Sequence, residues 1–521
     1  MKLRLSVSCV SFAVVLLACA GPDSKPQEQP PSKLEATLAR ARSALGWDIL
    51  AQRGGVVEVL GHTRWLGLDT RHTLRFDGGG RFVESLEGEL RQSSGFDGAR
   101  RWSRDWNDTP RELCLGDATN AELEELFKTG RWCLATERVK FEMAESASAE
   151  RIALAFRHVD GIQYGVLELD ARTFRPAALR FGTDGERNQW SFSDWRVVDG
   201  FAYAGAIETR DQGMQRNYGL DSVRVLASAE DEWFAARLAA PRDTRFDESI
   251  APQLEVKRVK SGHLLVHPRI DGVDRGWFIF DSGAGTNCIS KGVTDGLAGP
   301  IGEILATGVG GSNATHLWRA RELSIGPVRV ADPVFIELDL SFLEQHFGVP
   351  VGGILGYELL SRCVAQVDMA QSRIALHDPA RFTAPANTAW SKAWIYGRRP
   401  CVDASFEGRE GVFLIDTGAA SDTVTLHYQV VADLKLLEGR DTHESKSGGV
   451  GGFVATRDGV LDRFELGGRV FEALPASFAV EDKGALANDY VWGNIGGKLL
   501  EPFELIFDYP GERVGFVERS R

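Results

Sequence analysis

Short apolar runs separated by turn residues make up most of the chain after residue 50, and their length predicts β-strands. The first series ends near residue 91 and a second lies between residues 152 and 209. The runs are Val56–Leu60, Thr73–Phe76, Phe82–Leu86, Gly88–Arg91, Ile152–Phe156, Gly165–Leu169, Ala178–Phe181, Asn188–Trp195 and Tyr203–Thr209. Val159-Asp160-Gly161 and Val198-Asp199-Gly200 are typical hairpin turns. We therefore expect a strongly curved antiparallel sheet.

Two segments of this region have apolar positions at helical spacing. They are Leu34–Leu45, which precedes the first strand, and Asn120–Lys128, which lies between the two series. Around Ala239–Thr244 the composition becomes that of a linker. We therefore predict an N-terminal antiparallel β domain with helices at residues 33–245 and a mainly β chain.

An apolar strand that ends in a carboxylate and a turn of small residues occurs twice in the second half of the chain. Phe278–Ala284 reads FIFDSGA, and Phe413–Ala419 reads FLIDTGA. A lone carboxylate at the end of a buried strand is costly because it loses its hydration. The pattern is understandable if Asp281 and Asp416 meet and share one proton.

Four further landmarks follow each of these strands in the same order: a Gly-rich hairpin tip, a second hairpin, an apolar segment with two glycines, and a strand that includes an aspartate. They are Thr307–Gly311, Leu323–Gly326, Gly353–Leu360 and Asp368 in the first copy, and Gly448–Gly452, Phe464–Gly467, Gly493–Leu500 and Asp508 in the second. Equivalent landmarks are offset by 135 to 141 residues. This order predicts an internal duplication, with one lobe at residues 250–385 and another at 386–521.

Together these motifs resemble the aspartic peptidases. Ala284 and Ala419, which follow the Asp-Ser/Thr-Gly triplets, resemble the retroviral type and not the pepsin type. The resemblance covers about Glu255–Val517 and implies two tandem retropepsin-like β-barrel lobes that form a pseudo-twofold pair. It also implies a monomer with an intramolecular pseudo-dimer, similar to a fused version of the retroviral homodimer.

The resemblance assigns roles to particular residues. Asp281 and Asp416 would be the catalytic pair of an endopeptidase whose substrate is a peptide or protein. The supporting residues would be Ser282, Gly283, Thr417 and Gly418, and the flaps would carry Gly308, Gly310, Gly311, Gly449, Gly451 and Gly452. One carboxylate can take a proton from water while the protonated partner polarises the scissile carbonyl, so the reaction requires no cofactor and no metal.

Three positions depart from the pattern or add charge to it. Ser282 replaces the commoner Thr but keeps the hydroxyl. Asn494 stands where the first copy has Ile354, from which we expect a looser threading of the second Asp loop. Asp422 places a further carboxylate near the second site.

The first 32 residues resemble a bacterial lipoprotein leader. Lys2 and Arg4 precede an apolar stretch that is too short to span a bilayer, which predicts a signal peptide at residues 1–18. Ala18-Cys19 resembles a lipobox, which implies lipidation of Cys19, with plain secretion as the alternative. Residues 19–32, rich in Pro, Gln, Glu and Lys, are expected to be a tether. We expect a lipid-anchored protein of the cell envelope, on the outer membrane and facing the periplasm.

Charge and cysteine content add two expectations. A net charge of −13 without a basic cluster argues against binding to nucleic acid or to an anionic membrane surface. Of the seven cysteines, five lie beyond Cys19, in an oxidising compartment. Cys114 and Cys133 flank one short helical stretch and are expected to form a disulfide that closes a 20-residue loop. Spacing gives no sign of a metal site.

The N-terminal region resembles the half-barrel of outer-membrane lipoprotein carriers in its opening helix, in Gly95–Gly98 followed by Trp102, and in the turn at Leu169–Pro176. Eight of the thirteen Trp lie here, and either line a ligand site or pack in the core. Two alternatives to a peptidase stay open. One is a non-catalytic peptide- or lipid-binding envelope lipoprotein that retains the peptidase fold, and the other is transport of a hydrophobic ligand by the N-terminal domain.

Overall fold

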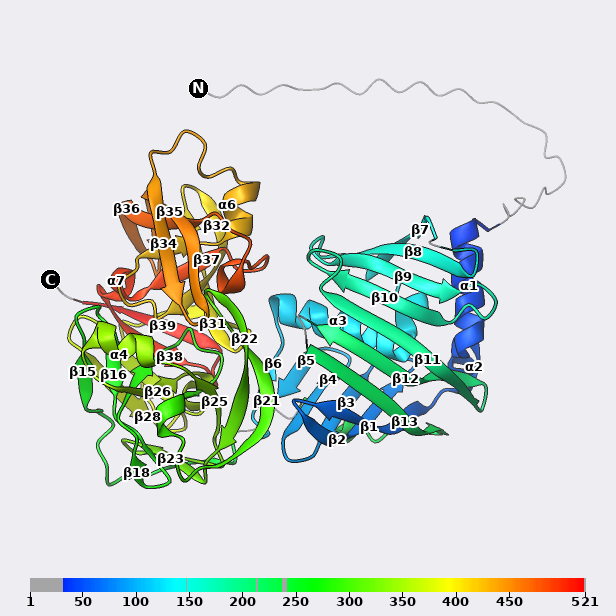
Figure 1. The fold of residues 1–521 in the computed structure, drawn as a ribbon, viewed down its shortest axis with the longest axis horizontal. Helices are drawn as coiled ribbons and strands as arrows, with labels where there is room; N and C mark the ends of the chain where they lie inside the picture. The colour runs from blue at the N-terminus through cyan, green and yellow to red at the C-terminus, as the bar shows by residue number, and fades with distance from the viewer. Residues whose placement is uncertain (1–30, 147, 212–213, 237–240, 520–521) are drawn as a thin grey trace, which may run out of the picture.

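The computed structural model of the chain describes residues 31–146, 148–211, 214–236 and 241–519. The fold is mainly β, as predicted, with one large N-terminal sheet and four further sheets beside it (Figure 1). The predicted signal peptide at 1–18, Cys19 and most of the predicted tether at 19–32 lie outside the described residues. No helix in the described part of the chain is long and apolar enough to cross a membrane.

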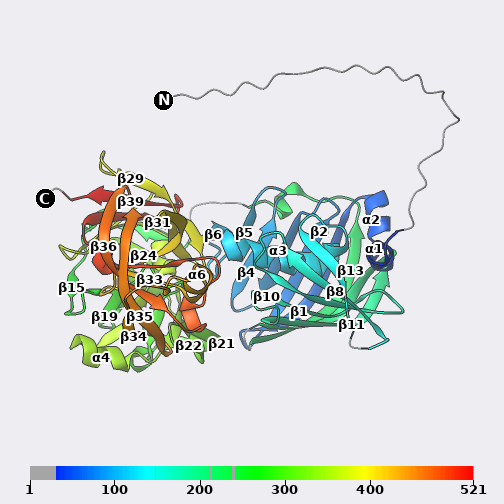
Figure 2. The same ribbon diagram turned by 90° about the horizontal axis from the view of Figure 1, so that it is seen from above.

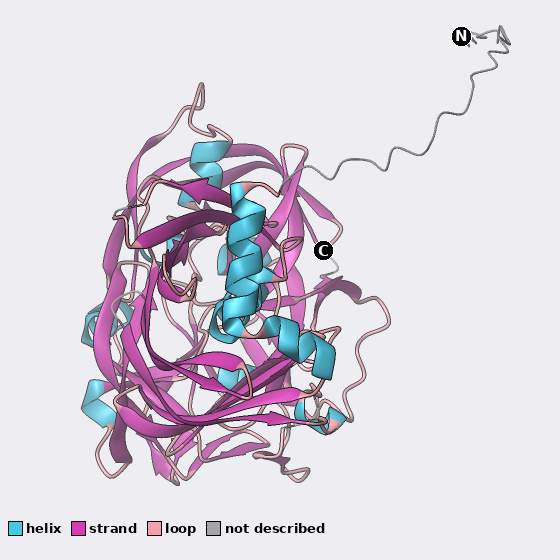
Figure 3. Cartoon of the chain, turned by 90° about the vertical axis from the view of Figure 1, so that its right-hand side faces the viewer, coloured by secondary structure: helices cyan, strands magenta, loops and turns pink. Residues whose placement is uncertain are grey.

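The N-terminal sheet has thirteen antiparallel strands and curves strongly (Figure 3). Its strand order is β6-β5-β4-β3-β2-β1-β13-β12-β11-β10-β9-β8-β7, so the first and last strands pair in the middle. The strands are β1 Val56–Trp65, β2 Leu68–Asp77, β3 Phe82–Glu87, β4 Arg91–Phe96, β5 Arg101–Arg104, β6 Pro110–Glu112, β7 Val139–Ala144, β8 Arg151–His158, β9 Tyr164–Asp170, β10 Pro176–Gly182, β11 Asn188–Val198, β12 Phe201–Asp211 and β13 Met214–Leu226. The predicted strand Gly88–Arg91 is wrong. It is mostly the turn between β3 and β4, because Glu87 pairs with Arg91 and closes a hairpin.

Helices fill the curve of this sheet. α1 (Lys33–Leu45) begins with a capping box between Ser32 and Glu35 and is followed by α2 (Trp47–Arg53). α3 (Leu115–Thr129) buries Leu126 and Phe127, and the Phe127 ring lies 5.0 Å from Phe156 of β8. Apolar residues of α3 share one core cluster with both arms of the sheet. The helix therefore holds the curvature by packing against strands from both halves.

Two eight-stranded sheets follow, and they have the same strand order. The first is β15-β16-β19-β26-β20-β25-β22-β21, and the second is β30-β31-β32-β37-β33-β36-β35-β34. The first contains β15 Val256–Arg258, β16 Leu264–Val266, β19 Trp277–Phe280, β20 Cys288–Ser290, β21 Ala298–Gly308, β22 Gly311–Arg319, β25 Val334–Leu338 and β26 Val351–Leu355. The second contains β30 Trp394–Tyr396, β31 Arg399–Phe406, β32 Arg409–Asp416, β33 Val424–Leu426, β34 His443–Gly449, β35 Gly452–Leu466, β36 Arg469–Ala479 and β37 Gly493–Gly496. We call them the first copy and the second copy, and their common order confirms the duplication.

A third sheet joins the two copies. Its order is β28-β27-β38-β39-β29, in which β27 follows the first copy and β38 follows the second. The five strands are β27 Val364–Asp368, β28 Arg373–His377, β29 Ala389–Lys392, β38 Phe503–Asp508 and β39 Arg513–Glu518. Side chains of both copies and of this sheet form one core cluster. The two copies are therefore packed as one body, with α5 (Tyr357–Leu360) and α7 (Gly497–Leu500) at corresponding places.

The N-terminal sheet lies against this body (Figure 2). Arg362, whose side chain is fully buried, contacts Asp105 of the N-terminal region at 3.2 Å and Asp243 of the linking segment at 2.7 Å. That segment continues into β14 (Thr244–Phe246), which pairs with β24 (Val328–Ala331) in the remaining sheet, β14-β24-β23-β17-β18. Its other strands are β17 Arg269–Ile270, β18 Val273–Asp274 and β23 Glu322–Ile325. The Glu303 N–H of β21 also donates to the Leu66 carbonyl in the β1–β2 turn at 2.9 Å. A buried cation and backbone pairing thus connect the two parts.

The predicted disulfide between Cys114 and Cys133 is wrong, because both are free thiols. Cys114 caps the start of α3, and Cys133 lies in a 3₁₀ turn beyond its end. A straight 15-residue helix is about 22 Å long, whereas a disulfide requires Cα atoms about 4.4–6.8 Å apart. The helix between the two cysteines is longer than the short stretch expected, and it keeps them apart. Burial raises the pKa of both thiols.

Candidate active site

The two predicted catalytic loops come together at the pseudo-twofold axis. Each follows a strand that pairs in parallel with the Gly-containing strand of its own copy, β19 with β26 and β32 with β37. In the first copy the Asp281 N–H donates to the Leu355 carbonyl at 3.0 Å, and in the second Asp416 lies opposite Gly496. The same local pairing therefore places both aspartates at the inner ends of their strands.

Ser282 and Thr417 interlock the loops through four hydrogen bonds. The Ser282 N–H donates to Thr417 Oγ1 at 2.9 Å, and the Thr417 N–H donates to Ser282 Oγ at 3.1 Å. The Ser282 hydroxyl then donates to the Ile415 carbonyl at 2.7 Å, and the Thr417 hydroxyl donates to the Phe280 carbonyl at 3.0 Å. Because all four bonds cross between copies and both side chains are buried, each loop fixes the position of the other.

Gly283 and Gly418 let each loop approach the opposite carboxylate. A side-chain carbon at Gly283 would overlap the Asp416 carboxylate, and one at Gly418 would overlap that of Asp281. Glycine is required here by the close approach, since no other residue would leave that space.

The two carboxyl groups lie within hydrogen-bonding reach of each other, and both residues are half-buried. Burial, followed by the nearby Asp416 charge, raises the pKa of Asp281 to about 8. Burial also raises the pKa of Asp416. Asp281 Oδ1 accepts from the Gly283 N–H at 2.7 Å, and Asp416 Oδ1 accepts from the Ala419 N–H at 3.1 Å. Two such groups share a proton and titrate as a pair, with the upper titration far above the usual range of an aspartate.

The six predicted flap glycines lie at the tips of two long hairpins. β21 and β22 form the first flap, with Gly308, Gly310 and Gly311 at its tip, and β34 and β35 form the second, with Gly449, Gly451 and Gly452. The Gly310 N–H donates to the Val450 carbonyl at 3.0 Å, so the two tips are in direct contact. A side-chain carbon at Gly310 would overlap the backbone at Gly451. The glycines therefore allow the tips to meet.

A family model described as "Aspartyl protease" matches this chain over residues 266–359 and 402–490, and each match contains one of the two aspartates. These are two retropepsin-like copies. A solved LolA superfamily protein from Nitrosomonas europaea is similar to this chain, with 15% identity and a TM-score of 0.30, over 39% of this chain and 96% of that protein. So low a TM-score supports no conclusion about the N-terminal region. No curated protein matches the chain.

Sequence reasoning missed two polar side chains, Asn494 and His427, that form a hydrogen-bonded series behind Asp416 in the second retropepsin-like copy. Asn494 Nδ2 donates to Asp416 Oδ2 at 3.0 Å, and Asn494 Oδ1 lies 2.8 Å from His427 Nε2. The looser threading expected from Asn494 is not found, because β37 pairs with β32 over four positions, with Asn494 opposite Leu414. Asn494 was singled out only as a departure, and His427 had no motif to indicate it. The predicted proximity of Asp422 is confirmed, since its charge acts on Asp416.

A histidine of the first retropepsin-like copy supports the loop of the second, and it was also missed. His263, just before β16, lies with Nε2 2.8 Å from the Gly418 carbonyl and with Nδ1 2.8 Å from Ser261 Oγ. Since the carbonyl can only accept, Nε2 carries the proton. Burial lowers the pKa of His263 to about 4, so the ring is neutral above that pH. The ring thus holds the loop by a neutral hydrogen bond.

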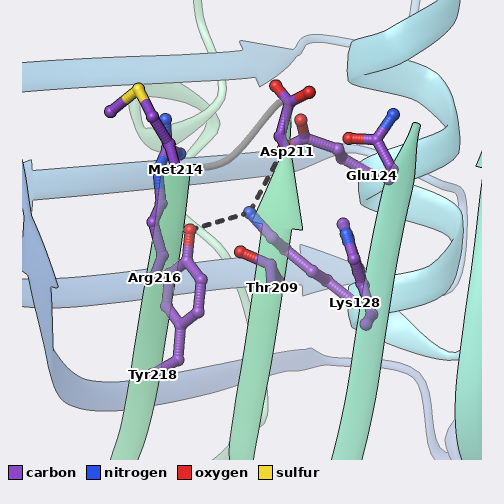
Figure 4. Close-up of a pocket in the computed structure, with 9 residues that line it drawn as sticks. Glu124, Lys128, Thr209, Asp211, Met214, Arg216 and Tyr218 are labelled. Carbon is purple, nitrogen blue, oxygen red and sulfur yellow. Dashed lines mark hydrogen bonds and ion pairs between the residues drawn. The ribbon is translucent and has the colours of Figure 1, made fainter. Parts of the chain in front are cut away.

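Two cavities of the N-terminal region are lined mainly by polar and charged residues. One of about 220 Å³ lies between α3 and the sheet and is lined by charged groups that include Glu84, Lys128 and Arg216. A smaller cavity of about 50 Å³ adjoins it and shares Lys128 and Arg216 (Figure 4). Lys128 lies 2.8 Å from Glu84, and its pKa is raised by that carboxylate against the opposing effect of burial. Hydrocarbon would desolvate these charges without pairing them, so the lining is unlike that of a hydrophobic-ligand site.

Proposed function

We propose that this protein is an aspartic endopeptidase that uses the carboxyl groups of Asp281 and Asp416 to hydrolyse peptide bonds of its substrate. The observation that carries the proposal is the interlocked pair of loops, because it brings two half-buried carboxyl groups within reach of one shared proton. A structural role alone would not favour this arrangement, since two adjacent carboxyl groups that lose part of their hydration are costly to keep in a folded protein.

The chemistry needs one ionised and one protonated carboxyl group. The ionised group accepts a proton from a water molecule, whose oxygen attacks the scissile carbonyl carbon. The protonated group donates a hydrogen bond to the carbonyl oxygen and stabilises the tetrahedral intermediate. The C–N bond then breaks as the leaving nitrogen receives a proton from the pair. Burial and the mutual charge of Asp281 and Asp416 support this role, since both favour retention of one proton.

The substrate we propose is an extended peptide segment lying under the two flaps. Backbone groups near the flap tips can bond such a peptide as an added strand, and the glycine-rich tips can open to admit it. The contact between Gly310 and Val450 would have to break or shift for entry. We further propose that the chain acts as a monomer, attached through lipid at Cys19 to the outer membrane and facing the periplasm.

The experiment that tests this function is turnover of a mixed peptide library by the purified protein, with and without a statine-type inhibitor that mimics the tetrahedral state. We expect cleavage that the inhibitor blocks and that Asp281→Asn abolishes. Binding of peptides without any cleavage, from acid to neutral pH, would instead identify the non-catalytic peptide-binding alternative.

A further inference from the structure

We propose that Asn494 and His427 make the catalytic pair unequal, so that Asp416 is the ionised carboxylate that activates water and Asp281 is the protonated acid. This deepens the proposed function and rests on it. Asn494 touches Asp416 directly and His427 acts through Asn494, so both are positioning residues.

The hydrogen-bond geometry sets the direction of the Asn494 amide. Asn494 Oδ1 lies 2.8 Å from His427 Nε2, and an amide oxygen can only accept, so His427 donates from Nε2. The amide NH₂ then faces Asp416 Oδ2 at 3.0 Å. Burial lowers the pKa of His427 to about 4, so the imidazole is neutral above that pH and orients the amide without adding charge.

Both oxygens of Asp416 consequently accept a hydrogen bond from a group that cannot take up the proton. The Ala419 N–H donates to Oδ1, and the Asn494 amide donates to Oδ2. Donors of this kind stabilise the ionised form of a carboxyl group. The remaining proton of the pair is therefore favoured on Asp281.

The first copy lacks this device. Strand pairing sets Asn494 opposite Thr425, and sets Ile354 opposite Cys288, so Ile354 occupies the corresponding place in the first copy. By the same pairing, Ser290 corresponds to His427. Both members of the amide–imidazole pair are thus particular to the second copy. The duplication supplies its own internal comparison: equivalent aspartates, with an amide donor beside one and an apolar side chain beside the other.

The other charged groups around Asp416 act in opposite directions. Arg399 lowers the pKa of Asp416, whereas Asp422 raises it. Burial and the Asp416 charge raise the pKa of Asp281, and the backbone N–H groups of Gly283 and Gly418 lower it; no side-chain amide stands beside Asp281 at the place of Asn494, which Ile354 occupies. Tyr509, whose hydroxyl donates to the Ser282 carbonyl at 3.4 Å, is buried with a raised pKa and stays neutral. His263 at the Gly418 carbonyl is neutral as well.

Selective labelling tests which carboxyl group is ionised. An ionised carboxylate attacks an epoxide carbon, forming an ester bond while the ring C–O bond breaks and its oxygen takes a proton from water. In the full-length wild type, treated with a small aryl glycidyl ether and mapped by mass spectrometry, we expect the label on Asp416. In Asn494→Leu, which keeps the size but removes the donor, we expect the labelling of Asp416 to require a pH higher by about one to two units.

Ile354→Leu is the matched control, because it makes the same final residue at the equivalent place and removes no hydrogen bond. It should label as the wild type does. Wild-type labelling at Asp281, or an unchanged profile in a folded Asn494→Leu, overturns the inference. Should Asn494→Leu fail to fold, the wild-type labelling decides alone. A wild type that cleaves no peptide refutes the proposed function, whereas one that cleaves peptides but labels at Asp281 refutes only this inference.

Discussion

Replacing Thr417 by valine tests how strongly the two loops depend on each other. The substitution preserves the shape of the side chain but removes the hydroxyl that accepts from the Ser282 N–H and donates to the Phe280 carbonyl. Both backbone groups belong to buried residues, and each unsatisfied group costs about 1–3 kcal/mol, so the free energy of unfolding should fall by about 2–6 kcal/mol. Calorimetric unfolding measures the loss, and hydrogen exchange of the peptide containing Ser282 locates it.

Thr417→Ser is the control, since the first copy already uses serine at the equivalent place and the hydroxyl keeps both bonds. It should lie within about 1 kcal/mol of the wild type, the scale of a lost methyl group. The reasoning is refuted if the valine and serine variants are equally stable, or if exchange at Ser282 does not increase in the valine variant.

Three further predictions concern other parts of the molecule. The pKa of Asp281 is about 8 in the folded protein and about 4 in the unfolded chain, so unfolding releases a proton between these pH values. The free energy of unfolding should therefore fall as the pH rises from about 4 to about 8. Asp281→Asn should abolish most of that fall, as measured by thermal unfolding across this pH range. Arg362→Met should lower the free energy of unfolding by about 3–5 kcal/mol, because it leaves Asp105 and Asp243 as uncompensated charges. The triple variant that also carries Asp105→Asn and Asp243→Asn should recover much of this loss in the same unfolding measurement. Cys19→Ser should move the protein from the membrane fraction to the soluble fraction in cell fractionation, and retention after a salt wash would show a different anchor.

The duplicated half could be predicted closely because each signal occurs twice. The strands that end in Asp281 and Asp416, the flap glycines and the apolar Gly segments all hold the places expected from their common order. The bonds across the axis followed from the resemblance and are confirmed by the Ser282–Thr417 contacts. A pattern that repeats in the same order at a nearly constant offset constrains topology far more than a single run of apolar residues does.

The wrong predictions concern features that depend on distances in the folded protein, which the local sequence does not give. The prediction of a Cys114–Cys133 disulfide is wrong because the whole of α3 lies between the two cysteines and keeps them apart. Gly88–Arg91 was read as a strand although it mostly closes a hairpin. His427 lies 67 residues from Asn494 and meets it only through the pairing of β33 with β37. Such a contact depends on which residues of two distant strands pair, and the periodicity of one sequence does not specify this.

The most direct test of the account is the rate of peptide hydrolysis by Asp281→Asn, Asp416→Asn and the double variant, each shown to be folded, on one peptide that the wild type cleaves. If the two carboxyl groups act as a unit, each single variant loses nearly all of kcat/KM and the double variant is scarcely slower than either. A folded Asp281→Asn that keeps most of the wild-type rate would contradict the two-carboxylate mechanism.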